Sequence, residues 1–89
     1  MKAIMTVIGA DRVGIIASIS AQLASMQVNI LDVNQTIMDG IFTMTMLVDT
    51  TASQHKFEDI RSALTACGNE LNLTIRIQRA DIFTAMHRI

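Results

Sequence analysis

The chain has 89 residues, 51% of them hydrophobic, so it forms one domain with enough apolar side chains for a core. Its net charge of −1 and its lack of Trp and Tyr argue against a nucleic-acid partner, which favours basic surfaces and stacking aromatic rings. The single cysteine, Cys67, excludes an internal disulfide and a cysteine-based metal cluster, which fits a cytoplasmic protein.

Residues 1–8 combine one positive charge with an apolar run, as the start of a signal peptide does. The run is too short for that role, Gly9 and Asp11 interrupt it, and no small-residue cleavage site follows. No segment reaches the roughly eighteen apolar residues of a membrane helix, so we expect no membrane partner. Residues 3–8, which are rich in β-branched side chains, predict a first strand.

The next two elements are a helix and a strand. From Gly14 onward the apolar residues recur at spacings of three and four, as in an amphipathic helix, and they are Ile15, Ile16, Ile19, Leu23 and Met26. Residues 29–38 then predict a second strand, with alternating polar and apolar faces. The polar face carries Asp32, Asn34 and Thr36, and the apolar face carries Leu31, Val33 and Ile37.

A hairpin, a helix and a last strand follow. Asp39-Gly40 predicts a tight turn, because both turn positions need a positive φ. Residues 41–49 predict a third strand whose core face carries Phe42, Met44, Met46 and Val48. Thr51 and Gln54 fit a capping box ahead of a second amphipathic helix, which we expect to end at Asn72. The apolar stripe of that helix is Phe57, Ile60, Leu64, Cys67 and Leu71, and residues 73–78 alternate as a fourth strand.

The order βαββαβ predicts an α+β ferredoxin-like fold, with a four-stranded antiparallel sheet and two helices on one face. In that fold the second strand lies at a sheet edge, where apolar residues without Lys or Pro invite pairing with a second copy. The face opposite the helices should be rich in threonine, with Ile4, Ile8 and Leu47 among the threonines. Residues 82–89 carry apolar side chains on one side of a helical turn, and we expect them to pack on the body of the dimer and cover part of this face.

The residues offer little for catalysis, so we expect no enzyme, no metal site and no cofactor. His55 and His87 are far apart in the sequence and lack carboxylates at ligand spacing. One enzymatic alternative stays open. Acylphosphatases, on the same fold, hold a phosphate with a loop Arg and position water with a strand Asn, and Arg12 with Asn29 or Asn34 would be the counterparts. The chain lacks the Gly-x-Val-Gln-Gly-Val motif of that family.

A stronger resemblance rests on two short motifs. The predicted loop and helix start read Asp11-Arg12-Val13-Gly14-Ile15-Ile16, and the second strand begins Asn29-Ile30. Over residues 2–79, in element order and spacing, the chain resembles ACT domains. Their loop often reads Asp-Arg-Pro-Gly before two aliphatic residues, and their second strand often begins Asn-Ile. Val13 replaces the common Pro, whereas the glycine that lets a ligand approach the backbone is kept.

Residues 81–89 are similar to the ending of a small bacterial group of stand-alone ACT proteins related to the glycine-cleavage regulatory protein. The resemblance implies a single regulatory domain over residues 1–89, with a core over 2–79 and an extension over 80–89. It implies a homodimer or higher homo-oligomer that binds a small molecule, commonly an amino acid, and regulates another protein. The ligand would lie where the loop of one copy meets the second strand of the other, at Asp11, Arg12, Val13, Gly14, Asn29 and Ile30.

An amino acid fits those positions chemically. Its carboxylate suits the free amides at the helix start, and its ammonium group suits Asp11 or the amide oxygen of Asn29. A simpler interpretation stays open, in which Asp11 only caps the helix and Asn29 only supports the turn into its strand. The domain would then be a ligand-free module for dimerisation or protein interaction.

Overall fold

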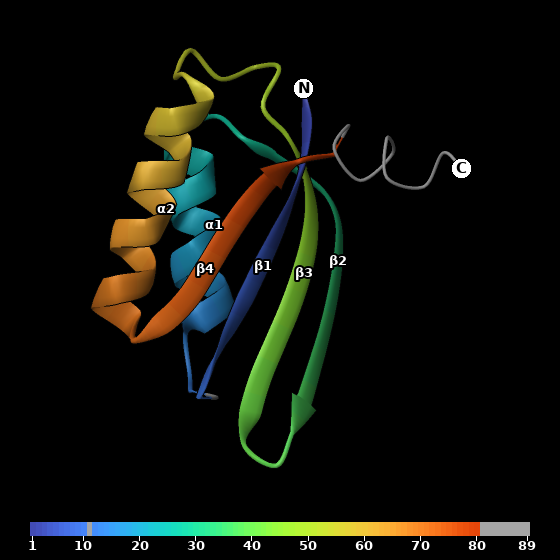
Figure 1. Ribbon diagram of the computed structural model, residues 1–89, viewed down its shortest axis with the longest axis vertical. Helices are drawn as coiled ribbons and strands as arrows, with labels where there is room; N and C mark the ends of the chain where they lie inside the picture. Colours follow the sequence, from blue (N-terminus) through green and yellow to red (C-terminus); the bar gives the residue numbers. More distant parts are fainter. Residues whose placement is uncertain (11, 81–89) are drawn as a thin grey trace.

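The computed structural model describes residues 1–10 and 12–80, and it contains six elements in the predicted order (Figure 1). They are β1 (Lys2–Ala10), α1 (Ile15–Ser25), β2 (Asn29–Met38), β3 (Ile41–Asp49), α2 (Phe57–Leu71) and β4 (Leu73–Arg79). The strands form one antiparallel sheet in the order β2-β3-β1-β4, so β2 and β4 are its edges. Both helices cover the same face of the sheet (Figure 1), which confirms the ferredoxin-like fold.

The core lies between the helices and the inner faces of β1, β3 and β4. Its most deeply buried large side chains are Met5, Val7, Ile19, Leu23, Met44, Met46, Val48, Ile60 and Leu64. On β3 the buried residues are the predicted ones, because alternate side chains of a strand point to the same face. Among the described residues, none of the helices is long and apolar enough to span a membrane.

Backbone conformation confirms two predicted boundaries. Asp39 and Gly40 have φ of 52° and 76°, both positive as the hairpin turn requires. Asn72 ends α2 in the left-handed region, with φ 57°. Gly68 lies inside that helix, where a Cβ atom would come within 2.8 Å of the Leu73 carbonyl oxygen. The absence of a side chain at Gly68 therefore lets α2 pack this closely against β4.

The predicted capping box at Thr51 and Gln54 is wrong. Helix α2 begins at Phe57, its N-cap is Lys56, and no side chain caps it. Thr51 instead binds the end of β3, since its amide and hydroxyl donate to Oδ1 of Asp49 at 3.0 and 2.6 Å. A local contact with Asp49, two residues earlier, thus takes the hydroxyl that the capping pattern assigned to the helix.

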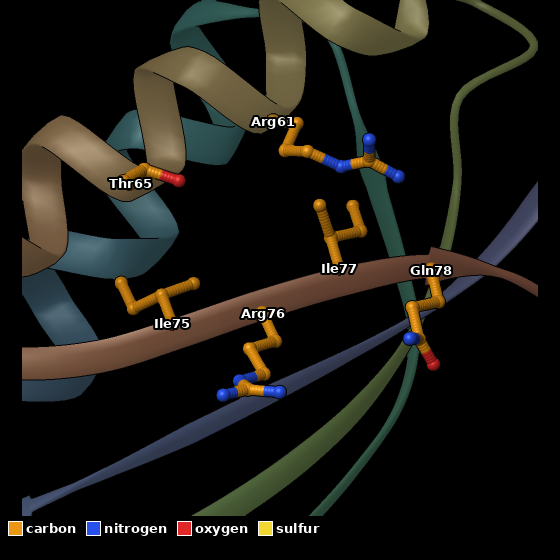
Figure 2. A pocket seen from close by; sticks show the side chains of 6 residues that line it. All are labelled: Arg61, Thr65, Ile75, Arg76, Ile77 and Gln78. Carbon is orange, nitrogen blue, oxygen red and sulfur yellow. The ribbon is translucent and has the colours of Figure 1, made fainter.

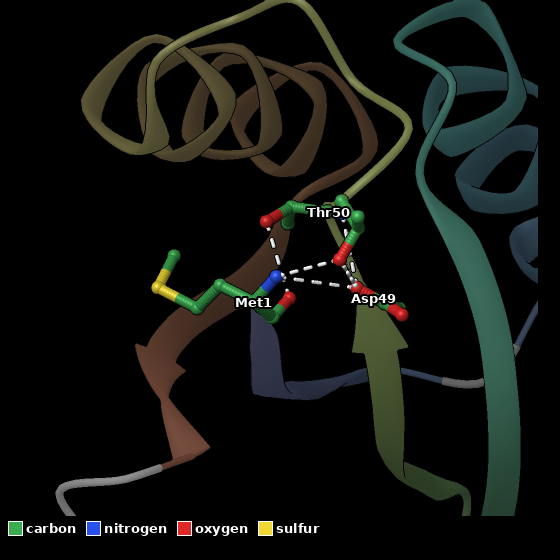
Figure 3. Close-up of polar contacts among 4 residues, drawn as sticks. Met1, Asp49 and Thr50 are labelled. Carbon is green, nitrogen blue, oxygen red and sulfur yellow. Dashed lines mark hydrogen bonds and ion pairs between the residues drawn. The ribbon is translucent and has the colours of Figure 1, made fainter.

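The start of β1 is hydrogen-bonded to the same segment, at the end of β3 (Figure 3). The Met1 ammonium donates to the Thr51 hydroxyl at 2.8 Å and lies 3.3 Å from Oδ1 of Asp49. The amide and hydroxyl of Thr50 donate to the Met1 carbonyl at 2.8 and 3.1 Å. The hydrogen bond from the Thr51 hydroxyl, then that from its amide and the nearby ammonium, lower the pKa of Asp49 from 3.8 to about 2.

Strand β2 differs from the others, because every one of its residues is exposed. A β-bulge at Leu31 shifts the register, so that Ile30 pairs with Val48 but Asp32 pairs with Leu47. Directly paired residues share a face of the sheet. The open face therefore carries Asp32, Asn34 and Thr36, as predicted, and the helix side carries Ile30, Val33, Gln35 and Ile37.

Three rows of side chains cross the open face from β4 to β2. The first is Gln78, Ile4, Leu47 and Asp32, the second is Arg76, Thr6, Thr45 and Asn34, and the third is Thr74, Ile8, Thr43 and Thr36. This is the predicted threonine-rich face, with its apolar pair in the row nearest the end of β4. The predicted packing of residues 82–89 on it concerns a segment outside the described residues.

Candidate functional site

The start of α1 presents backbone donors that no side chain of the described residues accepts from. Gly14 is the N-cap, with φ 89° and ψ 0°, and it makes no side-chain cap. The first hydrogen bond of the helix runs from the Ser18 amide to the Gly14 carbonyl at 2.9 Å. The amides of Ile15, Ile16 and Ala17 precede that bond, and the first turn carries no acidic residue. Such a helix start attracts an anion.

A hollow of about 490 Å³ lies beside this helix start. It is lined by Arg12, Gly14, Ile15, Ile16, Ala17, Gln35, Ile37 and Phe42. The β1–α1 loop and the first turn of α1 form one wall, and the helix side of β2 forms another. The hollow therefore joins a guanidinium, free amides and an apolar floor at the edge of the sheet.

The hollow continues into an apolar strip, which we call the seam: Ile16 of α1 with Ile30, Val33 and Ile37 of β2. All four side chains are exposed, although the three on β2 face the helix layer. Helix α1 buries Ile15, Ile19 and Leu23 and leaves Ile16 exposed. The seam thus combines the part of the inner sheet face that the two helices leave open with one exposed side chain of α1.

The structure brings some of the predicted ligand residues together and separates others. Arg12 and Gly14 line the hollow, whereas Val13 is fully exposed and does not. Asn29 and Ile30 lie at the opposite end of the sheet, since Asn29 pairs with Asp49. Asp11 lies outside the described residues. Within one chain, the loop and the start of β2 therefore form no common site.

Asn29 and Ile30 also differ in the face they occupy. Asn29 shares the open face with its partner Asp49, and Ile30 shares the helix side with Val48. Sequence reasoning missed Gln35, Ile37 and Phe42 as lining residues of the hollow. The alternation of β2 placed Ile37 on the inner side, but alternation does not show that the helices leave this side uncovered.

A second hollow, of about 430 Å³, lies between α2 and β4 (Figure 2). Its two arginines do not converge, because Arg61 lies on the helix side of β4 and Arg76 points to the other side. Arg61 is also engaged: it donates to Glu58 at 2.9 and 3.1 Å and lies 5.0 Å from the Phe57 ring centre. The two arginines of this hollow therefore do not form an anion-binding site.

Cys67 is half-buried between the helices, less deeply than its position in the apolar stripe predicted. Burial, and to a smaller extent the charge of Glu70, raises the pKa of its thiol. A thiol with a raised pKa is a poor nucleophile at neutral pH. In the described part of the chain, no three His, Cys, Asp or Glu side chains gather as a metal site would need.

The acylphosphatase-like arrangement is not formed within one chain. Arg12 lines the hollow on the helix side, and neither Asn29 nor Asn34 belongs to that lining. Asn34 lies on the open face opposite Thr45, and Asn29 lies at the far end of β2. No amide side chain of these two is therefore placed to orient water beside a phosphate held at Arg12.

Known proteins are similar to this chain over nearly its whole length. The ACT domain family model matches residues 2–78. A UPF0237 protein of Listeria innocua is 49% identical over 89 residues, 100% of both chains. An ACT domain protein from Streptococcus pneumoniae, of solved structure, is 42% identical with a TM-score of 0.83, over 93% of each chain. A putative glycine cleavage system transcriptional repressor shares the fold, at 22% identity and a TM-score of 0.77, over 86% of this chain and 44% of that one.

Proposed function

The chain belongs to the ACT domain family, and on this premise we propose that it is a regulatory domain that binds an amino acid at the interface of a homodimer. One observation carries the proposal: the hollow at the start of α1 opens onto the exposed edge of β2. One chain supplies the helix amides, Arg12 and the floor of the site. The β2 strand of the partner supplies the rest.

Pairing of two β2 strands accounts for the separation of the predicted residues. In an antiparallel pair related by a two-fold axis, the first residues of one strand lie beside the last residues of the other. The Asn29–Ile30 end of one copy then lies next to the Ile37 end of its partner, where the hollow is. The dimer thus joins the two halves of the motif that a single chain keeps apart.

The chemistry of the site suits a zwitterion. The ligand carboxylate binds the amides of the first turn of α1 and the guanidinium of Arg12, which both favour an anion. The aliphatic part of the ligand lies against Ile16 and Ile37 and against Ile30 of the partner, which faces the helix side. Asn29 of the partner lies on the open face of its sheet, so the ligand ammonium is met instead by the amide oxygen of Gln35, which lines the hollow.

The proposal assigns binding without catalysis. It needs only differential affinity for a ligand, which changes the stability or geometry of the dimer and thereby its contact with a regulated protein. The alternative within the same family is a dimerisation module without a ligand. The apolar seam alone supports that alternative, whereas Arg12 and the first-turn amides of α1 favour a ligand.

Thermal melting with each of the twenty amino acids, together with sedimentation equilibrium at micromolar concentration, tests the proposal. We expect a dimer, and one amino acid or a small set that stabilises the fold by about 2.7 kcal/mol at a hundred times its dissociation constant. Arg12→Gln should reduce that stabilisation, and Arg61→Gln, on the far side of the molecule, should leave it unchanged. A dimer that responds to no amino acid would favour the ligand-free module, and a monomer would contradict both versions.

A further inference from the structure

Strand β4 is the second edge of the sheet. It pairs with β1 along one side, and no strand of the described chain pairs with its other side. Proteins protect such edges with Pro, Lys or a β-bulge. The sequence of β4 contains neither Pro nor Lys, and its register with β1 has no irregularity. The outer side of β4 is therefore able to accept an added strand, which is a common way to bind an extended peptide.

A hollow of about 430 Å³ lies beside this edge, between α2 and β4 (Figure 2). Arg61 and Thr65 of α2 form one wall. Ile75 and Ile77 of β4 point towards α2 and form an apolar floor, whereas Arg76 points to the open face of the sheet. A helix next to an edge strand thus makes a groove that has room for the side chains of a strand added to β4.

The two halves of the sheet carry opposite charges. Strands β1 and β4 contain Lys2, Arg76 and Arg79 and no acidic residue. Strands β2 and β3 contain Asp32 and Asp49 and no basic residue. Arg76 is exposed, and its side chain makes no ion pair or hydrogen bond with the described residues. The β4 edge therefore attracts a partner with negative charge.

We propose that the β4 edge binds an extended acidic segment of another protein, which adds to the sheet as a strand next to β4. Successive side chains of a strand point to opposite faces. One set of the added side chains enters the hollow against Ile75 and Ile77, and the other set meets Arg76 on the open face. Arg61 already pairs with Glu58, so Arg76 recognises the charge. Arginines that do not converge on one anion thus suit an extended chain.

The charge of β4 disfavours a second copy of β4 as the occupant. Arg76 is the middle residue of the strand, so full antiparallel pairing of two β4 strands places the two Arg76 side chains opposite each other. Like charges at directly opposite positions destabilise a strand pair. The proposal does not rest on the amino-acid site. It holds for a monomer and also for the proposed dimer, in which pairing through β2 leaves one β4 edge free at each end of the joined sheet.

Amide chemical-shift mapping of the full chain with two synthetic peptides tests the proposal. The probe is an acetylated and amidated peptide of seven residues, the length of β4, in which Val and Glu alternate. The matched control peptide has Lys in place of each Glu. At physiological salt we expect the acidic peptide to shift the amide signals of residues 73–79. It should bind at least about tenfold more tightly than the basic peptide.

Two variants show whether Arg76 reads the charge. Arg76→Glu should reverse the preference, so that the basic peptide binds more tightly. Thr45→Glu is the matched control, because it places the same carboxylate in the same row of the open face but two strands away from β4. An added strand lies one spacing further, about 14 Å from Thr45 and beyond the screening length of about 8 Å at physiological salt. This variant should keep the preference of the wild-type protein.

The other outcomes would overturn the proposal. Millimolar acidic peptide that leaves the signals of residues 73–79 unshifted would show that the edge accepts no strand. Equal affinity of the wild-type protein for the two peptides would show that the edge does not select an acidic partner, and this comparison needs no variant. If Arg76→Glu changes the sedimentation of the protein without peptide, the occupant of the edge is a second copy of the chain.

Discussion

Strands β2 and β3 pair along their whole length, yet the inner face of β3 is buried and the inner face of β2 is exposed. Three cross-strand pairs on the helix side are Val48 with Ile30, Met46 with Val33, and Phe42 with Ile37. The β3 members are 0%, 1% and 3% exposed, and the β2 members are 38%, 42% and 56% exposed. Alternation decides the face of a side chain, but the position of the strand in the sheet decides whether a helix covers it. The exposed apolar residues of β2 are therefore the surface that the proposed dimer would cover.

The largest expected difference is in the stability of the monomer. Met46→Ala removes a buried side chain and should cost about 2–5 kcal/mol of unfolding free energy. Val33→Ala, on its exposed neighbour, should cost less than about 1 kcal/mol, because the side chain is already partly in water. Urea unfolding at the lowest protein concentration that the signal permits measures both values. Equal losses would mean that β2 is covered within one chain.

Association of two chains should instead depend on the exposed side chains of β2. Ile37→Lys places a charge in the seam and should weaken the dimer at least about a hundredfold, or about 2.7 kcal/mol. Ile41→Lys is a matched control, because Ile41 is 53% exposed against 56% for Ile37 but lies on the open face. Sedimentation equilibrium compares the two variants. If both dissociate to the same extent, the interface is not confined to the helix side of β2.

Most of the fold followed from the sequence, because its signals were local. Asp39-Gly40 requires a positive φ whatever surrounds it, and the apolar spacing of the second helix ends at Asn72 in any context. The capping box failed because α2 begins at Phe57, six residues after Thr51, and Thr51 instead bonds Asp49 two residues before it in a local turn. The bulge at Leu31 was missed for a different reason, since it appears only when the strand is paired.

The candidate site was harder to predict, because in the proposed dimer half of it comes from the partner. The loop motif predicted Arg12 and Gly14 as ligand residues, and both line the hollow at the start of α1. The strand motif predicted Asn29 and Ile30, which lie at the other end of the sheet in a single chain. No sequence motif marks the remaining wall of the hollow, which includes Gln35 and Ile37. The position of this wall depends on the order of the strands in the sheet, and the spacing of apolar residues does not reveal that order.

A smaller effect, on ligand affinity, should distinguish two glycines that both have a positive φ. Gly14 and Gly40 have φ of 89° and 76°, and a Cβ atom at either would meet nothing within 4 Å. Replacement of either by Ala should cost about 1–2 kcal/mol from the left-handed conformation. Only Gly14 lines the hollow, so Gly14→Ala alone should weaken binding of the amino acid found in the melting panel, by about tenfold or 1.4 kcal/mol. Unchanged affinity in a folded Gly14→Ala protein would place the ligand elsewhere.

The smallest expected effect concerns the other end of the same two strands, where Asp49 on β3 pairs with Asn29 on β2. In the folded protein the pKa of Asp49 is lowered from 3.8 to about 2, first by the Thr51 hydroxyl. The ionised carboxylate therefore stabilises the fold above about pH 4, and this contribution is lost as the pH falls towards 2. Asp49→Asn should lower the urea midpoint slightly near neutral pH, and its difference from the wild-type protein should shrink steadily as the pH falls from about 4 through about 2. Asp39→Asn, at the hairpin turn, removes the same charge and controls for net charge. A difference for Asp49→Asn that stays constant over this range would show that its neutral hydrogen bonds, and not its charge, hold the ends of β1 and β3 together.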